Sequence, residues 1–260
     1  ADIGLPGDQV ELVRRIRATG KPVVAVILAG RPLTVSDIVE EVDAILYAWH
    51  TGPMGGPAIA DLVFGNATPS GKLPATFPRV VGQIPIYYSQ KNGGKPPTKD
   101  NVVHIDEIDT FAPQTSLGMS AFHLDTCFTP LFPFGHGLSY TWFGYEHIRV
   151  SADEIRLGEN ITISVDICNH GDIEAEEVVQ LYTRDLVASL TRPVKELKGF
   201  RRIRLAPRET RTISVEIHTA DLAFYGREGR RVVEPGLFHV WIGGSSDAEL
   251  RTEFRIAKPT

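Results

Sequence analysis

Three residues at and just after the end of a short apolar run have side chains suited to binding a ligand: Trp49, His50 and Met54. An indole ring offers an apolar face with π electrons on which a sugar ring can stack. An imidazole can hydrogen-bond hydroxyl groups, and Met54 on the same loop would add an apolar wall. The alternative role is structural: Trp49 packs beneath the following helix, and His50 caps the loop.

The acidic residues do not predict a catalytic pair or a metal site. We interpret Asp2 as a turn residue and Asp8 as a helix N-cap. Asp106 and Asp109 lack the spacing of a calcium-binding loop. The other candidates are interpreted as solvated charges, and they are Glu40, Glu41, Asp43 and Glu107. No metal ligand is therefore assigned within this sequence.

Two glycine-rich motifs suggest nucleotide phosphates, and both fail. Residues 65–72 (GNATPSGK) place five residues between the glycines, and Leu73 stands where a P-loop has its magnesium-binding Ser or Thr. Residues 135–140 (GHGLSY) lack the third glycine of the dinucleotide fingerprint. No cofactor is predicted, and His136 in the second motif is interpreted as a linker histidine with satisfied hydrogen bonds.

The elements that would position the Trp49–Met54 loop are a strand and a helix. Residues 43–49 form an apolar run of strand length, and residues 57–64 carry apolar side chains at helical spacing. Gly55 and Gly56 would let the backbone pass where a side chain clashes, and Gly65 suits a left-handed helix cap. Open α/β sheets bind ligands at such strand ends, although most βα loops only connect elements.

The first half of the chain alternates helices and strands. Residues 8–19 predict an amphipathic helix with Val10, Val13 and Ile16 inward, and residues 22–29 predict a strand buried on both faces. Residues 35–42 predict a second helix. Two confident parallel strands are too few for a stable α/β layer, so we expect this domain to continue in sequence beyond the chain.

The second half changes to a period of two. Residues 89–124 are irregular and rich in Gly and Pro, and strand patterns then follow at residues 160–168, 178–184, 196–205, 210–217, 236–243 and 249–256. This spacing predicts an all-β sandwich of immunoglobulin-like type. The inward candidates are Ile161, Ile163, Val165, Val179, Leu181, Ile213, Val215, Phe238, Val240 and Ile242.

Long collinear motifs resemble glycoside hydrolase family 3, with the periplasmic bacterial β-glucosidases as the nearest type. They are AWHTGPMGGPAIADLVFGNATPSGKLPATFPRVVGQIPIYY, PLFPFGHGLSYTWF and RPVKELKGFRRIRLAPRET. The resemblance covers nearly the whole chain. It implies the end of an α/β sandwich domain with a mainly parallel sheet at residues 1–120, an aromatic linker at 121–142, and a fibronectin type III-like immunoglobulin sandwich at 143–260. Residues 89–124 look like an insertion relative to the family.

The resemblance also implies a function. The chain is expected to be the C-terminal portion of a retaining exo-β-glucosidase, with both catalytic carboxylates in a preceding N-terminal portion and the choice between glucose and xylose made by that portion's barrel. The implied partners are β-glucoside oligosaccharides, the N-terminal barrel portion of the same protein and, as one option, a second copy in a homodimer. The implied location is periplasmic or extracellular. The alternative is a non-catalytic module that binds carbohydrate or protein.

Composition narrows these choices. The net charge of −5 and the sequence pI of about 5.9 argue against nucleic acid as a partner. The sequence lacks the apolar run of about 18 residues that a transmembrane helix needs. The two cysteines, Cys127 and Cys168, fall in different predicted domains and are interpreted as free thiols. The sandwich is not expected to bind glucose, because no cluster of aromatic and acidic residues is apparent in it.

Overall fold

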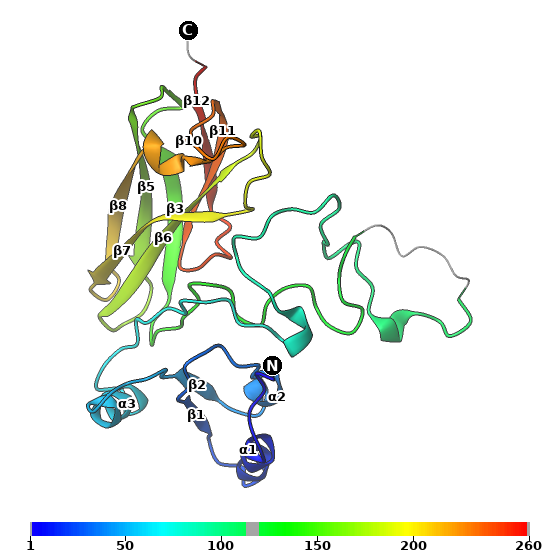
Figure 1. Cartoon of the computed structure of the whole chain (residues 1–260). Helices are drawn as coiled ribbons and strands as arrows, with labels where there is room; N and C mark the ends of the chain where they lie inside the picture. Colours follow the sequence, from blue (N-terminus) through cyan, green and yellow to red (C-terminus); the bar gives the residue numbers. More distant parts are fainter. Residues whose placement is uncertain (1, 113–119, 259–260) are drawn as a thin grey trace. The chain divides into compact units, whose positions relative to one another are not determined.

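The computed structural model describes residues 2–112 and 120–258, which group into two compact units (Figure 1). Unit 1 comprises residues 1–67, 75–86 and 93–132. Unit 2 comprises residues 68–74, 87–92 and 133–260. Each unit has a hydrophobic core of its own.

Unit 1 contains the predicted alternation of helices and strands. Strands β1 (Val24–Ile27) and β2 (Ala44–Tyr47) pair in parallel. The helices are α1 (Gln9–Arg17), α2 (Ser36–Val39) and α3 (Gly55–Val63). Two short 3₁₀ turns follow, η1 (Val81–Gln83) and η2 (Ile105–Glu107). As predicted, Gly65 ends α3 with a positive φ of 77°.

The core of unit 1 is small. Ile27, Val35 and Ile38 are buried, and Val10 and Val13 of α1 pack partly against them. Two expectations are wrong here: Ile16 is 42% exposed, and β1 is not buried on both faces, since Val24 and Leu28 are 45% and 60% exposed. The reason is that the described side chains cover only the face of β1 that carries Ala25 and Ile27.

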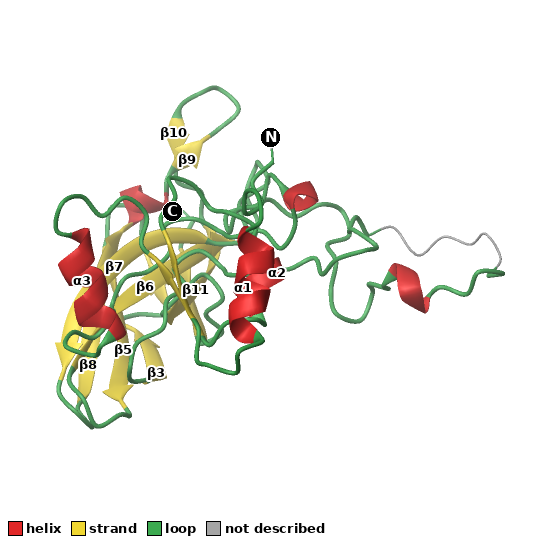
Figure 2. Cartoon of the chain, turned by 90° about the horizontal axis from the view of Figure 1, so that it is seen from below, coloured by secondary structure: helices red, strands yellow, loops and turns green. Residues whose placement is uncertain are grey.

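Unit 2 is built on two packed sheets. The five-stranded sheet has the order β4 (Glu154–Ile155), β12 (Arg251–Ile256), β11 (Gly236–Gly243), β6 (Ala175–Asp185) and β7 (Glu196–Leu205). The three-stranded sheet has the order β3 (Phe143–Val150), β5 (Asn160–Asn169) and β8 (Thr210–His218). A 3₁₀ turn, η3 (Thr219–Leu222), leads to a ribbon of β9 (Phe224–Tyr225) and β10 (Arg231–Val232), visible beyond the main sheets in Figure 2.

The core of the sandwich follows the predicted alternation. Every inward candidate is buried except Val215, which is partly buried and packs on the same cluster. At about 25 cal/mol per Å² of apolar surface, this burial is the main stabilising contribution. The predicted fold class, an α/β segment followed by a β-sandwich, is thereby confirmed.

Three segments outside the sandwich strands also belong to unit 2: residues 68–74, 87–92 and 133–142. The first and the third are joined by backbone hydrogen bonds, from Leu73 N to His136 O and from Gly135 N to Leu73 O, both 2.8 Å. The second segment reaches the loop before β7, where Val194 N donates to Gln90 O at 2.8 Å. Residues 133–142 of the linker share the hydrogen-bond network of the sandwich, since Ser246 N donates to Phe134 O at 2.9 Å.

Both cysteines are free thiols, Cys127 exposed and Cys168 half-buried. No helix among the described residues is long and apolar enough to cross a bilayer.

Candidate functional site

The predicted loop leaves the sheet of unit 1 at the carboxyl ends of its strands. β1 and β2 run in parallel, with Ile27 opposite Tyr47, and Ala48 N extends the pairing by donating to Ile27 O at 2.8 Å. Trp49 comes next and has a φ of 54°, in the left-handed region that few residues other than Gly adopt. Such strained backbone is found at ligand-binding sites more often than elsewhere.

The Trp49 ring is half-buried on an aromatic cluster. Its centroid lies 4.8 Å from the Tyr47 ring and 6.0 Å from the Phe77 ring, in tilted and edge-on arrangements. Phe77 is buried and contacts Tyr47 edge-on at 4.9 Å. These contacts fix the indole and leave part of its surface accessible, so the sugar-stacking role of Trp49 stays a prediction.

Tyr47 and Phe77 are supporting residues that the sequence analysis did not identify. The Tyr47 hydroxyl donates to Arg31 O at 2.5 Å and accepts from Leu33 N at 3.2 Å, which ties β2 to the turn after β1. Burial raises the pKa of this hydroxyl, and the Leu33 N–H opposes that shift. Tyr47 could have been found, because residues two apart on a strand share a face; nothing in the sequence places Phe77.

His50 and Met54 occupy exposed positions. The His50 ring lies against Gly30, where a Cβ atom would stand 2.7 Å from Nε2. Met54 immediately precedes α3 and is 70% exposed. Of the two loop glycines, Gly55 is required, since a Cβ atom there would clash with the Thr51 side chain. The expectation for Gly56 is wrong, because nothing lies within 4 Å of a Cβ there.

The acidic residues of unit 1 have structural contacts. Asp2 accepts from Gly4 N at 2.8 Å, as expected of a turn residue. Asp8 occupies the N-cap position of α1 but makes no side-chain cap bond. Asp43 accepts from Val23 N at 2.8 Å and pairs with Arg17 at 3.3 Å. Within residues 2–112 and 120–258, no group of three or more His, Cys, Asp or Glu is placed to hold a metal ion.

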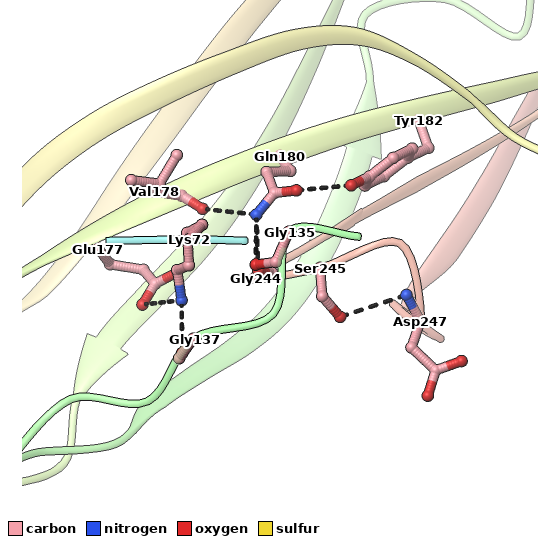
Figure 3. Close-up of polar contacts among 10 residues, drawn as sticks. All are labelled: Lys72, Gly135, Gly137, Glu177, Val178, Gln180, Tyr182, Gly244, Ser245 and Asp247. Atoms are coloured by element: carbon pink, nitrogen blue, oxygen red, sulfur yellow. Dashed lines mark hydrogen bonds and ion pairs between the residues drawn. The ribbon is translucent and has the colours of Figure 1, made fainter. Parts of the chain in front are cut away.

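Unit 2 contains a buried polar cluster (Figure 3). Lys72 Nζ lies 2.9 Å from Glu177 Oε1 and donates to Gly137 O at 2.9 Å. Glu177 shares the inward alternation of Val179 on β6, so its carboxylate points between the sheets. Burial raises the pKa of Glu177, and Lys72 opposes the shift. Burial, with smaller contributions from Glu177, raises the pKa of Tyr145 well above its usual value.

The outward side chains of β6 continue this cluster. Gln180 Nε2 donates to Gly135 O at 3.1 Å and to Gly244 O at 2.6 Å, and Tyr182 donates to Gln180 Oε1 at 2.5 Å (Figure 3). Burial raises the pKa of Tyr182 far above its usual value; its hydroxyl therefore remains a donor at physiological pH. The GHG motif thus packs against β6, and His136 has its pKa lowered by burial and by Lys72.

Comparison with known proteins identifies the family. Residues 1–140 match the glycosyl hydrolase family 3 C-terminal domain, and residues 177–246 match a fibronectin type III-like domain. The chain belongs to glycosyl hydrolase family 3. The resemblance inferred from the sequence motifs is confirmed by this match.

Relatives of this family 3 chain include β-glucosidases and β-xylosidases. It is 41% identical over 94% of its length to a periplasmic β-glucosidase of Salmonella typhimurium, covering 30% of that protein. It is 39% identical over 96% of its length to a β-xylosidase of Formosa agariphila, covering 32% of that protein. The chain therefore spans about a third of the length of these relatives.

Solved structures agree. A β-glucosidase from Listeria innocua in complex with isofagomine superposes with a TM-score of 0.86 at 37% identity, covering 98% of this chain and 34% of that one. A mutant of the Listeria enzyme in complex with laminaribiose gives a TM-score of 0.86 at 36% identity, with 98% and 33% covered.

Proposed function

We propose that this chain is the C-terminal portion of a retaining exo-β-glucosidase that removes terminal β-D-glucosyl residues from oligosaccharides. The observation that carries the proposal is the collinear similarity to β-glucosidases over 94% to 98% of the chain. Retaining hydrolysis needs two carboxylates about 5 to 5.5 Å apart. In this proposal both come from the part of the enzyme that the chain does not span.

The chain's contribution is one border of the sugar site. Trp49, held by Tyr47 and Phe77, would stack on a sugar ring at the leaving-group side. His50 is exposed and can hydrogen-bond hydroxyl groups, and Met54 supplies an accessible apolar surface. A periplasmic location is part of the proposal, supported by the name of the Salmonella relative.

Turnover of an aryl β-glucoside tests whether the catalytic groups lie outside this chain, as proposed. We expect a polypeptide that joins this chain to the proposed N-terminal portion to hydrolyse it, and the purified 260-residue chain to give no turnover above a buffer blank, since the proposal places both catalytic carboxylates outside it. Activity of the short chain would overturn the proposal. A natural polypeptide of only about this mass would instead support a non-catalytic binding module.

Trp49→Ala in the longer enzyme tests the loop. If the indole contacts the sugar equally in ground and transition states, KM for disaccharides rises while kcat stays nearly unchanged. A large loss of stability, about 3 to 5 kcal/mol, with unchanged KM would identify Trp49 as a core residue only. Met54→Ala is the companion variant: its exposed side chain costs little stability, so a rise in KM there is attributable to the site.

A further inference from the structure

The outer face of the three-stranded sheet carries one large aromatic residue. Trp142 directly precedes β3, and the pairing of Phe143 with Asn169 brings Trp142 opposite His170. Inward positions of β5 and β8 are occupied by core residues, so the alternate side chains point outward. These outward residues are small or polar. They include Thr162, Ser164, Asp166 and Cys168 of β5 and Thr210, Thr212 and Ser214 of β8, and Gly144 lies beside them on β3.

Trp142 is both fixed and accessible. Its ring stacks on the His170 ring, with centroids 3.8 Å apart and planes 13° from parallel. His170 in turn lies on the backbone of Gly144, where a Cβ atom would clash with the imidazole. His170 N also donates to Trp142 O at 3.0 Å. The indole nevertheless is 63% exposed, so one ring face is supported and much of the other is open.

Hydrogen-bonding groups continue from the indole along the same face. Asp166 precedes His170 by four residues, or about 13 Å along an extended strand. Its carboxylate is held by both terminal nitrogens of Arg149, at 2.8 and 3.1 Å, by Thr212 Oγ1 at 2.6 Å and by His147 Nδ1 at 3.2 Å. These groups are ordered before any ligand arrives, which lowers the entropy cost of binding.

The segments that enter unit 2 from earlier in the sequence contact the other sheet. Gln180 of β6 donates to Gly135 O, and Tyr182 of β6 contacts the Tyr88 ring at 5.7 Å. Leu197 N of β7 donates to the Tyr88 hydroxyl at 3.4 Å. Within the described part of unit 2, these segments therefore lie on the outer face of the five-stranded sheet, at β6 and β7. In Figure 1, β3, β5 and β8 form the opposite layer of the sandwich.

We propose that the outer face of the three-stranded sheet binds an extended β-linked glucan, with a glucosyl ring stacked on Trp142 and hydroxyl groups bonded by Arg149 and Thr212, which Asp166 holds in place. A pyranose ring presents C–H groups to the indole face and hydroxyl groups around its edge, which matches one aromatic surface beside a polar strip. Binding groups spread over about 13 Å along β5 suit an extended chain of several sugars better than one glucose. The site does not depend on the proposed β-glucosidase activity.

Titration of the 260-residue chain with cellohexaose, followed by calorimetry and by the indole N–H resonances, tests the site. Trp142→Ala should weaken binding roughly tenfold, a typical loss for one aromatic stacking contact. Trp142→Phe should retain most of the affinity, and it keeps the test valid if the Ala variant fails to fold. His170→Ala should give an intermediate loss, because it removes the support and not the stacking surface.

The matched control is Phe200→Ala. Phe200 is 68% exposed on β7 of the other sheet, so its truncation should leave cellohexaose binding unchanged. Glucose alone should not saturate the site, and the α-linked maltohexaose should bind more weakly than cellohexaose. Equal affinities of the wild-type and Trp142→Ala chains, or no binding of cellohexaose, would overturn the proposal. Loss of a dimer in Trp142→Ala would also overturn it, since a second copy would then be the occupant.

Discussion

Lys72 Nζ lies 2.9 Å from Glu177 Oε1, although the two residues are 105 positions apart in the sequence. Their side chains are only 12% and 5% exposed. A buried ion pair gains Coulomb energy but loses the hydration of both charges, so it contributes little net stability while intact. Removing only one of the two side chains is costly, because the remaining buried charge is then left without its partner.

Lys72→Met should therefore lower the free energy of unfolding by about 3 to 5 kcal/mol. Glu177→Gln should also destabilise the fold, and the double variant should lose much less than the sum of the two single losses. Urea unfolding of the four proteins measures the coupling. Additive losses would mean that the two side chains act independently.

The cost of Lys72→Met should also depend on pH. Burial already raises the pKa of Glu177, and removing the ammonium takes away the main opposing influence. A carboxyl group with a raised pKa in the folded state destabilises the fold as pH rises through that pKa. The loss caused by Lys72→Met should thus be large at neutral pH and shrink as pH falls below about 4, where the carboxyl group becomes protonated in the unfolded chain as well as in the folded one.

The positive φ of Trp49 indicates backbone strain, and this strain predicts which of two substitutions at Trp49 gives the more stable protein. Both Trp49→Ala and Trp49→Gly remove the ring contacts with Tyr47 and Phe77. Only Gly adopts the left-handed conformation without a steric penalty, which is about 1 to 2 kcal/mol for other residues. Trp49→Gly should therefore unfold at a higher urea concentration than Trp49→Ala. The reverse order would show that the loop relaxes out of this conformation once the indole is gone.

The sandwich could be predicted from sequence because alternation along a strand depends on local side-chain direction alone. β5 and β8 alternate without interruption, and both were found. β3 was missed because a bulge between Glu146 and Arg149, with His147 at a φ of 53°, breaks the period of two. Irregular backbone of this kind leaves no regular pattern to read.

The candidate loop could be predicted from the sequence, whereas the support that it receives from a distant segment could not. Trp49, His50 and Met54 could be proposed from the sequence because chain order places them after a strand and before a helix; their role in binding stays a prediction. Their long-range contacts could not be found: Phe77 supports the indole from another segment, and Lys72 looked like part of a failed phosphate loop. Charge pairing between a loop residue such as Lys72 and a distant strand residue such as Glu177 has no local pattern, and only the three-dimensional structure reveals it.

The shared network of the sandwich and linker predicts how fragments behave. Residues 143–260 contain the complete core cluster and should fold alone. Residues 133–260 should be more stable by about 1 to 2 kcal/mol, because they restore the bond from Gln180 to Gly135 O and the contact of Ser246 N with Phe134 O. Thermal unfolding of both fragments checks this. Equal melting temperatures would show that the linker contacts contribute nothing to the sandwich.

Asp185 ends β6 in a buried position, 7% exposed, and accepts from Val187 N at 3.3 Å. Burial raises its pKa from 3.8 to about 6, with Glu234 and Glu196 adding to the shift. The Val187 N–H and the Arg192 guanidinium oppose it. Arg192 itself is committed elsewhere, at 2.7 Å to Glu196 and 4.3 Å from the centre of the Phe224 ring.

The folded state thus binds a proton at Asp185 more tightly than the unfolded chain does. Its carboxyl group favours folding least at high pH, and the loss develops as pH rises from about 4 to about 6. Asp185→Asn removes the ionisation and keeps an acceptor for Val187 N. Relative to wild type, this variant should gain about 1 to 2 kcal/mol between pH 4 and pH 7. Urea unfolding at both pH values measures the gain, and a pH-independent difference would show that Asp185 ionises as freely in the folded chain as in the unfolded one.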